Sequence, residues 1–395
     1  MNEKTYVITD YGVKANSDEL QTEAIQRVLD LCGKTGGTVV IPEGRFTAAG
    51  LLMHSDTTIL LKTGAVLLGS EECTDYAVCA VPEGVELRTD MELIDEYYRT
   101  YPYMAPDKNE YRRAIISAYG AKNIAIIGEE GSLIDGQDCF DPKGEEGFRG
   151  PHGIFLTNCE NITLRGYTIQ NNGNFMHQLD NCVNTDMRNV VCLAGHDGIH
   201  LHHCVHTLIE DCRFITGDDC IAGINFEDLI IRRCELNTSC QLFRIGGHDM
   251  LVEDCRMYGP GYYPHRKTVV RGKHDVLSRE EGRHNLISMI CFFASSSFPS
   301  EIPYGNLVFR RCSIDYADCI LHYYADGGPL ENGAYLGDMT FEDVKFTNVL
   351  HPSDVIASEK FPTTIYLKNV EATFRENSPF HALFPVIPNF TVVEE

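Results

Sequence analysis

The sequence predicts an all-β protein, a right-handed parallel β-helix (solenoid) with an N-terminal capping helix. The main observation is a repeated phrase, which in its four best copies reads HTLIEDCRF, EDLIIRRCEL, HDMLVEDCRM and GNLVFRRCSI. Each copy has two apolar residues four and three places before a cysteine, and charged residues fill the two positions between. Strand-like phrases with a period in the low twenties are typical of a stacked solenoid, in which each copy is one turn, here called a rung.

The spacing of the cysteines gives the length of a rung. The steps from Cys212 to Cys234 and from Cys234 to Cys255 are 22 and 21 residues, and the step from Cys291 to Cys312 is again 21. Weaker copies have other residues at the cysteine position, namely Gly166, Val190, Val344 and Val370. The windows alternate as strands do, whereas helical repeats need longer units. Residues one period apart are therefore expected in adjacent rungs, about 4.8 Å apart.

We expect one domain over residues 1–395, because a solenoid grows by stacking and no linker rich in Pro, Gly or Ser interrupts the chain. Its parts are predicted as an N-terminal cap with the first rungs at 1–70, a loop insert at 74–113, the main rungs at 114–375 and a C-terminal tail at 376–395. Within the cap, Ser17-Asp18 is predicted to start a helix. The apolar stripe of that helix would be Leu20, Ala24, Ile25, Val28 and Leu29.

Two rungs are longer than the others. The step from Cys255 to Cys291 is 36 residues, and the step from Cys312 to Val344 is 32. Extra residues in a solenoid leave as loops, often on one binding face. The chain has no Trp, so stacking on a sugar is expected from tyrosines of these loops, namely Tyr262, Tyr263, Tyr323 and Tyr324.

The formal net charge of −24 argues against nucleic acid and anionic membranes as partners. No secretion signal or membrane-spanning apolar run is evident in the sequence. The sixteen cysteines are expected to lie at one rung position as reduced, buried residues. These features predict a cytoplasmic protein, and they indicate no particular oligomeric state.

Three aspartates are predicted to converge on one face of the solenoid. Asp197 lies in GHDGIH, and Asp218 and Asp219 lie in TGDDCIAG. Asp219 follows Asp197 by 22 residues, so the two are expected to stack, with Asp218 beside them at a bend. Carboxylates this close cannot all ionise readily, so one is expected to hold a proton. Glycosidic hydrolysis needs such a set, with one acid for the leaving oxygen and others to activate water. Turn aspartates and a cation site are the alternatives.

With these phrases in view, the chain resembles glycoside hydrolase family 28, the polygalacturonase family on the pectin-lyase-like parallel β-helix. The opening YGVKANSDELQTEAIQRVLDLCGKTGGTVVIPEGRF resembles the entry cap of that family, and LLKTGAVLLGS resembles its first rungs. The family phrase N-T-D-G-I-D matches Gly195 to His200, and G-D-D-C matches Gly217 to Cys220. The family phrase R-x-K matches Arg271-Gly272-Lys273.

The resemblance implies roles for these residues. Asp218 would be the general acid, and Asp197 with Asp219 would position and deprotonate the water. Arg271 and Lys273 would hold a substrate carboxylate. The family inverts the anomeric carbon, which suits carboxylates wider apart than those of a retaining pair.

The chain departs from the family at four motif positions. Gln241 stands where the family has the histidine of G-H-G, and Arg244 stands where a small residue is usual. Gly195 and His200 replace two other motif residues. The aspartates are thus kept while the residues for substrate recognition differ. Arg244 would either bind an anionic group or neutralise the carboxylates, and both interpretations stay open.

The stretch HDGIHLHHCVH contains five histidines, at 196, 200, 202, 203 and 206. His200 and His202 share a strand face, which would allow a transition-metal pair completed by Asp197. No further ligand is evident on the next rung, so we predict no metal and no cofactor. His196 is the histidine expected to touch the substrate. The other substrate-binding residues predicted on the rungs are His200, Gln241 and Arg244.

The sequence therefore predicts a glycosidase. It would hydrolyse, with inversion, glycosidic bonds in short pectin-derived oligosaccharides that contain uronic acid or rhamnose. An exo-acting mode is expected because the long loops could close the groove. One alternative is a lyase on the same fold, in which Arg244, Arg271 or Lys273 would be the base. An isomerase and a non-catalytic carbohydrate-binding protein are further alternatives.

Overall fold

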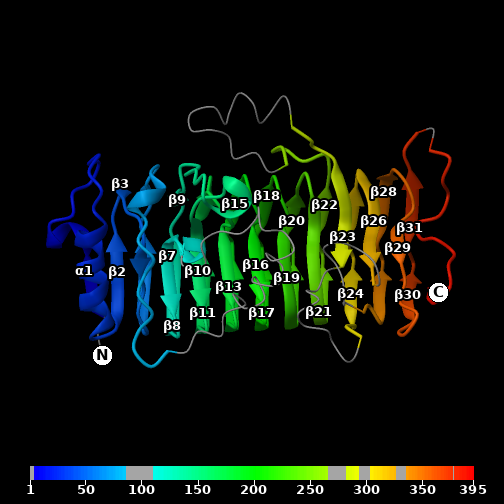
Figure 1. Cartoon of the computed structure of the whole chain (residues 1–395), viewed down its shortest axis with the longest axis horizontal. Helices are drawn as coiled ribbons and strands as arrows, with labels where there is room; N and C mark the ends of the chain where they lie inside the picture. Colours follow the sequence, from blue (N-terminus) through cyan, green and yellow to red (C-terminus); the bar gives the residue numbers. More distant parts are fainter. Residues whose placement is uncertain (1–3, 86–109, 266–281, 293–302, 326–334, 377) are drawn as a thin grey trace.

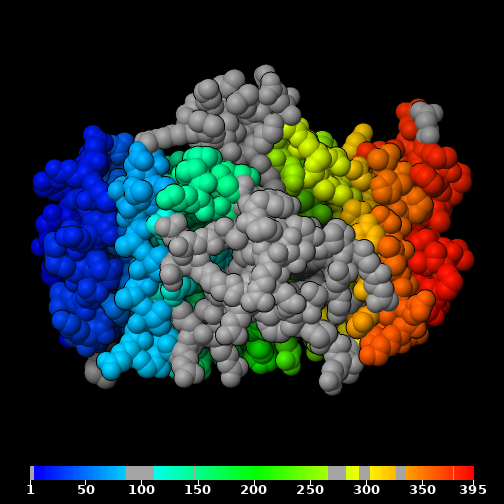
Figure 2. All heavy atoms as spheres, viewed as in Figure 1, coloured from blue at the N-terminus to red at the C-terminus, as the bar shows by residue number. Residues whose placement is uncertain are grey.

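The chain winds into one long stack of rungs. The computed structural model describes residues 4–85, 110–265, 282–292, 303–325, 335–376 and 378–395. Helix α1 lies at one end of the stack and the C-terminus lies at the other (Figure 1). The surface in Figure 2 follows the same order, from the blue N-terminal residues at one end to the red C-terminal residues at the other. The predicted fold class, a right-handed parallel β-helix with an N-terminal capping helix, is confirmed.

Two sheets run the length of the described stack, and they contain 21 and 11 strands. The strands of the larger sheet are β1 (Thr5–Val7), β2 (Gly37–Ile41), β4 (Leu51–Leu52), β5 (Thr57–Leu61), β7 (Ala114–Tyr119), β8 (Lys122–Gly128), β10 (His152–Thr157), β11 (Glu160–Arg165), β13 (His177–Asp180), β14 (Val183–Arg188), β16 (Ile199–His202), β17 (Val205–Glu210), β19 (Ile221–Arg232), β21 (Gln241–Glu253), β23 (Leu286–Phe292), β24 (Leu307–Arg310), β26 (Ala317–Tyr324), β27 (Asp338–Glu342), β29 (Asp354–Ile356), β30 (Thr363–Lys368) and β32 (Phe390–Glu394). The strands of the smaller sheet are β3 (Gly44–Thr47), β6 (Ala65–Leu68), β9 (Leu133–Asp135), β12 (Thr168–Gln170), β15 (Val191–Ala194), β18 (Arg213–Thr216), β20 (Glu235–Asn237), β22 (Arg256–Tyr258), β25 (Ser313–Asp315), β28 (Lys345–Val349) and β31 (Glu371–Phe374). Helix α1 spans Thr22–Gly33, and the short 3-10 helices are η1 (Ile8–Tyr11), η2 (Cys73–Asp75), η4 (Glu110–Arg112) and η5 (Glu145–Gly147).

Each rung of the central stack has three arms, two from the larger sheet and one from the smaller sheet. The rung that contains β16, β17 and β18 pairs in parallel with the next rung, and His200 lies beside Ala222. On the second arm, Thr207 lies beside Leu229. Both pairs are 22 residues apart in number, so the period read from the sequence is the register of the sheets.

The cysteine column confirms one part of the predicted repeat and corrects another. Cys212, Cys234 and Cys255 follow one another as expected, because Glu235 N donates to Cys212 O and Arg256 N donates to Cys234 O, at 3.0 and 2.9 Å. The next member is Cys312, since Ser313 N donates to Cys255 O at 3.1 Å. Cys291 lies instead on β23, on the first arm, between Arg244 and His322. The first of the two long rungs therefore runs from Cys255 to Cys312, and the second runs from Cys312 to Val344. The 21-residue step from Cys291 to Cys312 joins two different arms.

The cysteines do not share one rung position, as the sequence had indicated. A second column, formed by Cys159, Cys182 and Cys204, lies at the turn between the first two arms, and its thiols donate to backbone carbonyls. The weak copy that was assigned to Gly166 from the sequence is also shifted by one residue. Val191 N donates to Tyr167 O, so Tyr167 and not Gly166 stands at the cysteine position in the rung next to Val190. All sixteen cysteines are free thiols, and fourteen of them are buried. A thiol fits both turns because it is small, apolar and able to donate weakly to a carbonyl.

The charged pair before each cysteine alternates in sign from rung to rung. The pairs are Glu210-Asp211, Arg232-Arg233, Glu253-Asp254, Arg310-Arg311 and Glu342-Asp343. Because these pairs lie in register, opposite charges meet across rungs, with distances of 2.5 Å from Arg232 to Glu210 and 2.8 Å from Arg310 to Glu342. The second residue of each pair has a positive φ, between 50° and 55°. This left-handed turn is costly for a residue other than Gly, so the ion pairs support a conformation that the chain does not favour by itself.

The two ends of the stack are covered differently. Helix α1 begins at Thr22 rather than at Ser17-Asp18, because the side chain of Gln21 binds the backbone of Lys14 and holds the preceding segment outside the helix. Ile25, Val28, Leu29 and Cys32 of the helix are buried, whereas Leu20 precedes the helix and is 44 % exposed. At the other end, β32 pairs with β30, so residues 390–394 of the predicted tail continue the sheet. Within the described ranges, no helix combines the length and the apolar character that a membrane crossing requires.

The division of the chain into cap, insert, rungs and tail stays a prediction, and residues 86–109 of the predicted insert lie outside the described residues. Of the tyrosines predicted to stack on sugars, Tyr262 is exposed and its ring lies 5.0 Å from that of Tyr263. Tyr324 is half-buried. Tyr323 is 1 % exposed, and its hydroxyl accepts a hydrogen bond from Leu336 N at 3.0 Å. The prediction for Tyr323 is therefore wrong, because its ring belongs to the core.

Candidate active site

The predicted site lies where the smaller sheet passes back to the larger sheet. In three successive rungs this connection is a short bend, at residues 195–198, 217–220 and 238–240. Gly198 N donates to Asp219 O at 3.0 Å, and Cys220 N donates to Gln241 O at 3.1 Å. These bonds place Asp197, Asp219 and Gln241 one above the other. The vertical stacking expected from the 22-residue spacing is therefore present.

Three carboxylates share this place. Oxygens of Asp197, Asp218 and Asp219 all lie within 4.8 Å of one another. The three residues are only 3 %, 1 % and 1 % exposed. Asp219 Oδ1 accepts a hydrogen bond from the backbone N of Gln241 at 3.0 Å, so Gln241 holds Asp219 through its main chain.

A buried arginine contacts the cluster. Arg149 Nη2 donates to Asp218 Oδ2 at 3.2 Å, and its Nη1 donates to Asn174 Oδ1 at 3.2 Å. The guanidinium also lies over the ring of Phe175, with its carbon 5.1 Å from the ring centre. Arg149 is 3 % exposed. The period of the rungs does not predict Arg149, because this residue lies in the irregular segment between β9 and β10.

Asp197 is the end of a chain of hydrogen bonds through two histidines. His200 Nε2 lies 2.5 Å from Asp197 Oδ2, and His200 Nδ1 lies 3.1 Å from His202 Nε2. Gln178 Nε2 reaches His202 Nδ1 at 3.5 Å. One set of neutral tautomers satisfies all three contacts, with Gln178 donating to His202, His202 to His200, and His200 to Asp197.

The surroundings favour neutral His200. Burial, and then the neighbouring His202 and Arg244, lower the pKa of His200 well below its ordinary value. The ring of Phe175 stacks on that of His200, with centres 4.0 Å apart and planes at 6°. Both ring nitrogens and one ring face of His200 are thus engaged by the protein. The pair of His200 and His202, for which the sequence allowed a metal, is part of this hydrogen-bonded chain.

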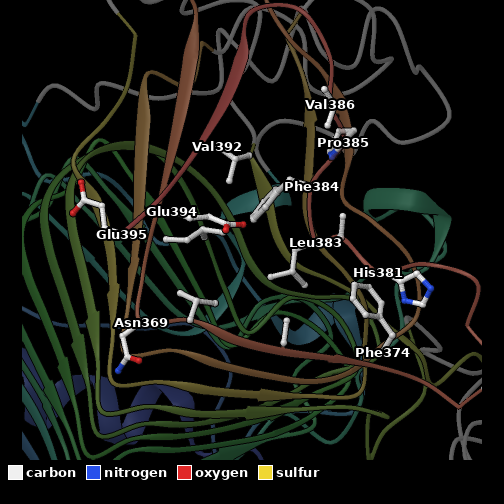
Figure 3. A pocket seen from close by; sticks show the side chains of 14 residues that line it. Asn369, Phe374, His381, Leu383, Phe384, Pro385, Val386, Val392, Glu394 and Glu395 are labelled. Atoms are coloured by element: carbon white, nitrogen blue, oxygen red, sulfur yellow. The ribbon is translucent and has the colours of Figure 1, made fainter.

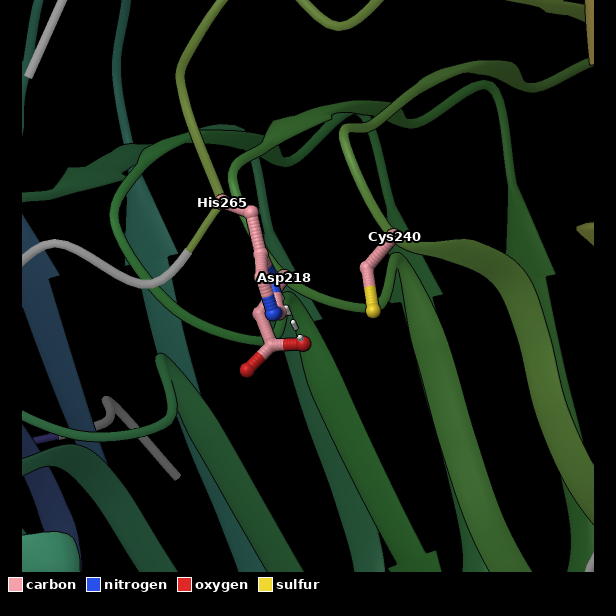
Figure 4. Close-up of side chains that lie close together, drawn as sticks. All are labelled: Asp218, Cys240 and His265. Carbon is pink, nitrogen blue, oxygen red and sulfur yellow. Dashed lines mark ion pairs between the residues drawn. The ribbon is translucent and has the colours of Figure 1, made fainter. Parts of the chain in front are cut away.

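Two further side chains lie near Asp218. His265 Nδ1 is 3.8 Å from Asp218 Oδ1, and Cys240 precedes Gln241 in the third bend. In Figure 4 the imidazole of His265 and the thiol of Cys240 both point toward the Asp218 carboxylate. Cys240 Sγ also donates to Gln241 Oε1 at 2.8 Å. His265 comes from the long loop after β22, and no rung spacing connects it to Asp218.

The remaining predicted site residues are spread along the same face. His196 is 1 % exposed and stacks on Phe148, with ring centres 6.1 Å apart. Arg244 is half-buried and lies in the vertical column of His200, with Ala222 between them. Arg271 and Lys273 lie outside the described residues. The structure thus brings His200 and Gln241 to the aspartates and places Arg244 two rungs along from His200.

A pocket of about 520 Å³ lies elsewhere, at the C-terminal end of the stack. Figure 3 shows its walls, which include Asn369, His381, Leu383 and Phe384. Its lining residues begin at Leu367, more than a hundred positions after the aspartates, and contain none of the predicted site residues. We therefore base the candidate active site on the aspartate cluster and not on this pocket.

Comparison with known proteins identifies what the chain is similar to. Residues 84–248 match the family model described as Glycosyl hydrolases family 28. The resemblance to family 28 is confirmed. The family 28 match contains the three aspartates, the His200–His202 chain and Arg149, whereas His265 lies after its end.

Two curated relatives cover different shares of the chain. The exo-poly-alpha-D-galacturonosidase of Dickeya chrysanthemi is 34 % identical over 144 residues, which are 34 % of this chain and 19 % of that protein. The probable polygalacturonase of Vitis vinifera is 25 % identical over 251 residues, 57 % of this chain and 48 % of that protein. The chain thus spans less than half the length of either relative.

A solved structure extends the likeness of the fold to the whole chain. The hyperthermoactive exopolygalacturonase of Thermotoga maritima has a TM-score of 0.68 to this chain. The two share 14 % identity, and the match covers 100 % of this chain and 92 % of that one. At this identity the likeness concerns the fold, which is the same β-helix.

Proposed function

We propose that the protein is a glycosidase of the polygalacturonase type, which removes sugar units from one end of short pectin-derived oligosaccharides. The observation that carries the proposal is the cluster of Asp197, Asp218 and Asp219, three buried carboxylates with oxygens within 4.8 Å of one another. A glycosidic bond is cleaved by an acid that protonates the leaving oxygen and a base that activates water, and this cluster offers both groups. The family 28 match over residues 84–248 supports the assignment.

In the proposed mechanism, the proton of the Asp218 carboxyl group passes to the leaving oxygen while a water oxygen attacks the anomeric carbon. The water proton passes to Asp197 or Asp219. Hydrogen bonds hold each of these bases, since His200 contacts Asp197 and the Gln241 backbone contacts Asp219. Catalytic carboxylates that are fixed in this way need little rearrangement during the reaction.

Inversion of the anomeric carbon is part of the proposal, and the resemblance to family 28 supports it. The distances favour the second candidate, retention. The nearest oxygens of the three carboxylates are within 4.8 Å, whereas the two carboxyl groups of inverting pairs usually stand about 6.5–9.5 Å apart. The wider separation expected from the sequence is therefore not observed between the nearest oxygens. NMR of the first product decides between the two, because an α-linked substrate yields the β-anomer by inversion and the α-anomer by retention.

The proposed substrate is a short oligosaccharide with a uronic acid or rhamnose unit, attacked from its end. The net charge of −24 disfavours a long acidic polymer. Arg149 and Arg244 bring positive charge to the site face and would favour a substrate carboxylate. Two of the similar proteins are named as exo-acting enzymes, which supports end-wise attack here.

The test is the pair of variants Asp218→Asn and Asp219→Asn, assayed on galacturonate-containing di- and trisaccharides. Each substitution removes a group that moves a proton, so turnover should fall by about 10²–10⁴-fold with the circular dichroism spectrum unchanged. Asp228→Asn is the matched control, because Asp228 is exposed and bonded to His206 at 2.7 Å, away from the cluster. Wild-type rates in both active-site variants would refute the assignment. A product with the ultraviolet absorbance of an unsaturated sugar would indicate a lyase.

We also propose that the protein works in the cytoplasm, where thiols stay reduced. The proposal is supported by the two turn columns, in which each cysteine serves as a small buried group and donates through its thiol. Titration of the unfolded chain without reductant should find most of the sixteen cysteines as free thiols. Finding several disulfides in protein taken from its own cell would contradict this location.

A further inference from the structure

We propose that Asp218, Cys240 and His265 form a binding site for a thiophilic divalent transition metal, for which Zn²⁺ is the reference ion, and that the bound metal stops hydrolysis. A carboxylate oxygen of Asp218, the Cys240 sulfur and an imidazole nitrogen of His265 all lie within 4.8 Å of one another. Figure 4 shows the three side chains directed toward a common space. The binding site itself is independent of the proposed function, and only its effect on hydrolysis rests on it.

The donor set identifies the class of ion. Sulfur, imidazole nitrogen and carboxylate oxygen together are the ligands of zinc and related ions, whereas Ca²⁺ and Mg²⁺ prefer oxygen alone. Ligand atoms around a tetrahedral zinc stand about 3.3–3.8 Å apart, given bonds of about 2.0–2.3 Å. The contact of 3.8 Å between His265 Nδ1 and Asp218 Oδ1 is about 0.5 Å longer than the roughly 3.3 Å that nitrogen and oxygen ligands would have. Ligand atoms that lie up to 4.8 Å apart would have to approach by up to about 1.5 Å to coordinate the ion.

The three ligands stand on backbone that hydrogen bonds fix in place. The carbonyl of Asp218 accepts from Thr216 Oγ1 at 2.7 Å. Cys240 N donates to Thr238 Oγ1 at 3.0 Å. His265 N donates to Arg283 O at 2.9 Å. A metal would thus bind ligands that are largely in position before it arrives, which lowers the cost of ordering them.

One glycine lets the loop of His265 approach the bend of Asp218. A Cβ atom on Gly217 would lie 2.3 Å from Pro264 O, which is backbone and cannot give way locally. Any larger residue at position 217 would push residues 264 and 265 outward. The side chain of His265 is 21 % exposed while that of Asp218 is 2 % exposed, so an ion from solvent would meet His265 first.

A metal bound at this site would prevent Asp218 from acting as the proposed general acid. Zinc binding replaces the proton of the Cys240 thiol and the proton of the Asp218 carboxyl group, and both protons are released to solvent. A carboxylate that is bound to a metal cannot carry a proton to the leaving oxygen. The expected behaviour is reversible inhibition by zinc, relieved by a chelator.

The first experiment uses Co²⁺ as a spectroscopic probe on the metal-free full-length protein, without substrate. A thiolate bound to Co²⁺ gives a charge-transfer band in the near ultraviolet, so one equivalent of Co²⁺ should produce that band and one equivalent of Zn²⁺ should remove it. Cys240→Ser should abolish the band and weaken zinc binding by at least about tenfold, because even indirect loss of support for a metal ligand costs about 10–100-fold. His265→Gln should weaken zinc binding in the same way. Absence of the band in the wild type would overturn the proposal.

Cys319→Ser is the matched control. Cys319 is also buried, and it lies two rungs along the column of Gln241 through Ser288, away from Asp218 and His265. This variant should keep the cobalt band and the zinc sensitivity of the wild type. A band that survives Cys240→Ser but disappears in Cys319→Ser would place the metal elsewhere and sink the assignment.

The second experiment measures oligosaccharide hydrolysis against added zinc. When each protein is compared with its own metal-free rate, Cys240→Ser should need at least about ten times more zinc for half inhibition than the wild type. Equal zinc sensitivity in the variant and the wild type would refute the switch. If the cobalt band forms but no substrate is hydrolysed in any assay, the metal site stands and the proposed function fails.

Discussion

At the scale of single residues, His200 is better described as a positioning residue than as a substrate contact. Its Nε2 lies 2.5 Å from Asp197, and its other nitrogen meets His202. The stacked ring of Phe175 fixes the plane of the imidazole. Since burial lowers its pKa, His200 holds Asp197 as a neutral donor and orients the carboxylate toward the water that it is proposed to activate.

Replacing His200 with Gln should therefore lower kcat more than it changes KM. A hydrogen bond to a charged group contributes about 1.5–3 kcal/mol, so kcat should fall by at least about tenfold. His206→Gln is the control, because His206 is exposed and pairs with Asp228 on another part of the surface. Steady-state kinetics on a galacturonate trisaccharide measure kcat and KM separately. An unchanged kcat with a raised KM would show that His200 binds substrate instead.

The sequence could predict those site residues that obey the period of the rungs. Asp197 and Asp219 are 22 residues apart, and the register turns that spacing into contact. Phe175 lies another 22 residues before Asp197, so the same argument could have found it. Arg149 and His265 come from irregular segments, whose paths depend on packing and not on a repeat. The period of the rungs therefore cannot predict that Arg149 and His265 lie close to Asp218.

At the scale of strands and turns, the rows of alternating charge hold neighbouring rungs together. Glu210 is the most enclosed member, with its side chain 3 % exposed between the guanidinium groups of Arg188, Arg232 and Arg233. Burial opposes its ionisation, but hydrogen bonds from Arg233 and Arg232 lower the pKa of Glu210 overall. The sequence phrases already alternate ED, RR, ED, RR, and the register shows that these pairs lie beside one another in adjacent rungs.

Glu210→Gln should destabilise the protein by roughly 1–3 kcal/mol at neutral pH, because hydrogen bonds between charged groups are lost from a nearly buried position. Urea unfolding followed by circular dichroism measures the change. Glu371→Gln is the control, since Glu371 forms a pair with Lys345 that is largely exposed and should cost about 0–1 kcal/mol. The lowered pKa means that the contribution of Glu210 exists above its ordinary pKa and is lost as pH falls through the folded value. The difference between wild type and Glu210→Gln should thus shrink in acid, and a constant difference would contradict this account.

At the scale of the whole molecule, buried histidines make the folded stack sensitive to acid. Burial lowers the pKa of His177 to about 4 and that of His152 to about 3. The His177 ring donates from Nδ1 to Gly198 O and accepts from the hydroxyl of Tyr167, both at 2.9 Å, so it is held neutral beside the Asp197 bend. The unfolded chain binds a proton on each histidine near pH 6.5, and the folded chain does not.

The contribution of these neutral histidines to the free energy of unfolding should therefore be fully present above about pH 6.5, and it should decline as pH falls toward the folded pKa values. For His177 alone, the loss should reach roughly 3 kcal/mol near pH 4. His177→Gln keeps a donor and an acceptor without the titration, so its unfolding free energy should change less between pH 7 and pH 4.5. His381→Gln, at an exposed histidine, should keep the wild-type pH dependence. Identical pH dependence in His177→Gln and wild type would show that His177 is not the group responsible.

The alternating sign of the charged pairs also restricts how many rungs the stack can lose or gain. Excising residues 212–233 would remove a single rung and bring Glu210-Asp211 beside Glu253-Asp254, so that two acidic pairs would face each other. Excising 212–254 would remove two rungs and set the same acids beside Arg310-Arg311, restoring attraction. Within these rows the solenoid can lose or gain two rungs at a time and keep opposite charges beside each other. Loss or gain of one rung places like charges beside each other, and neighbouring residues would have to change to relieve the repulsion.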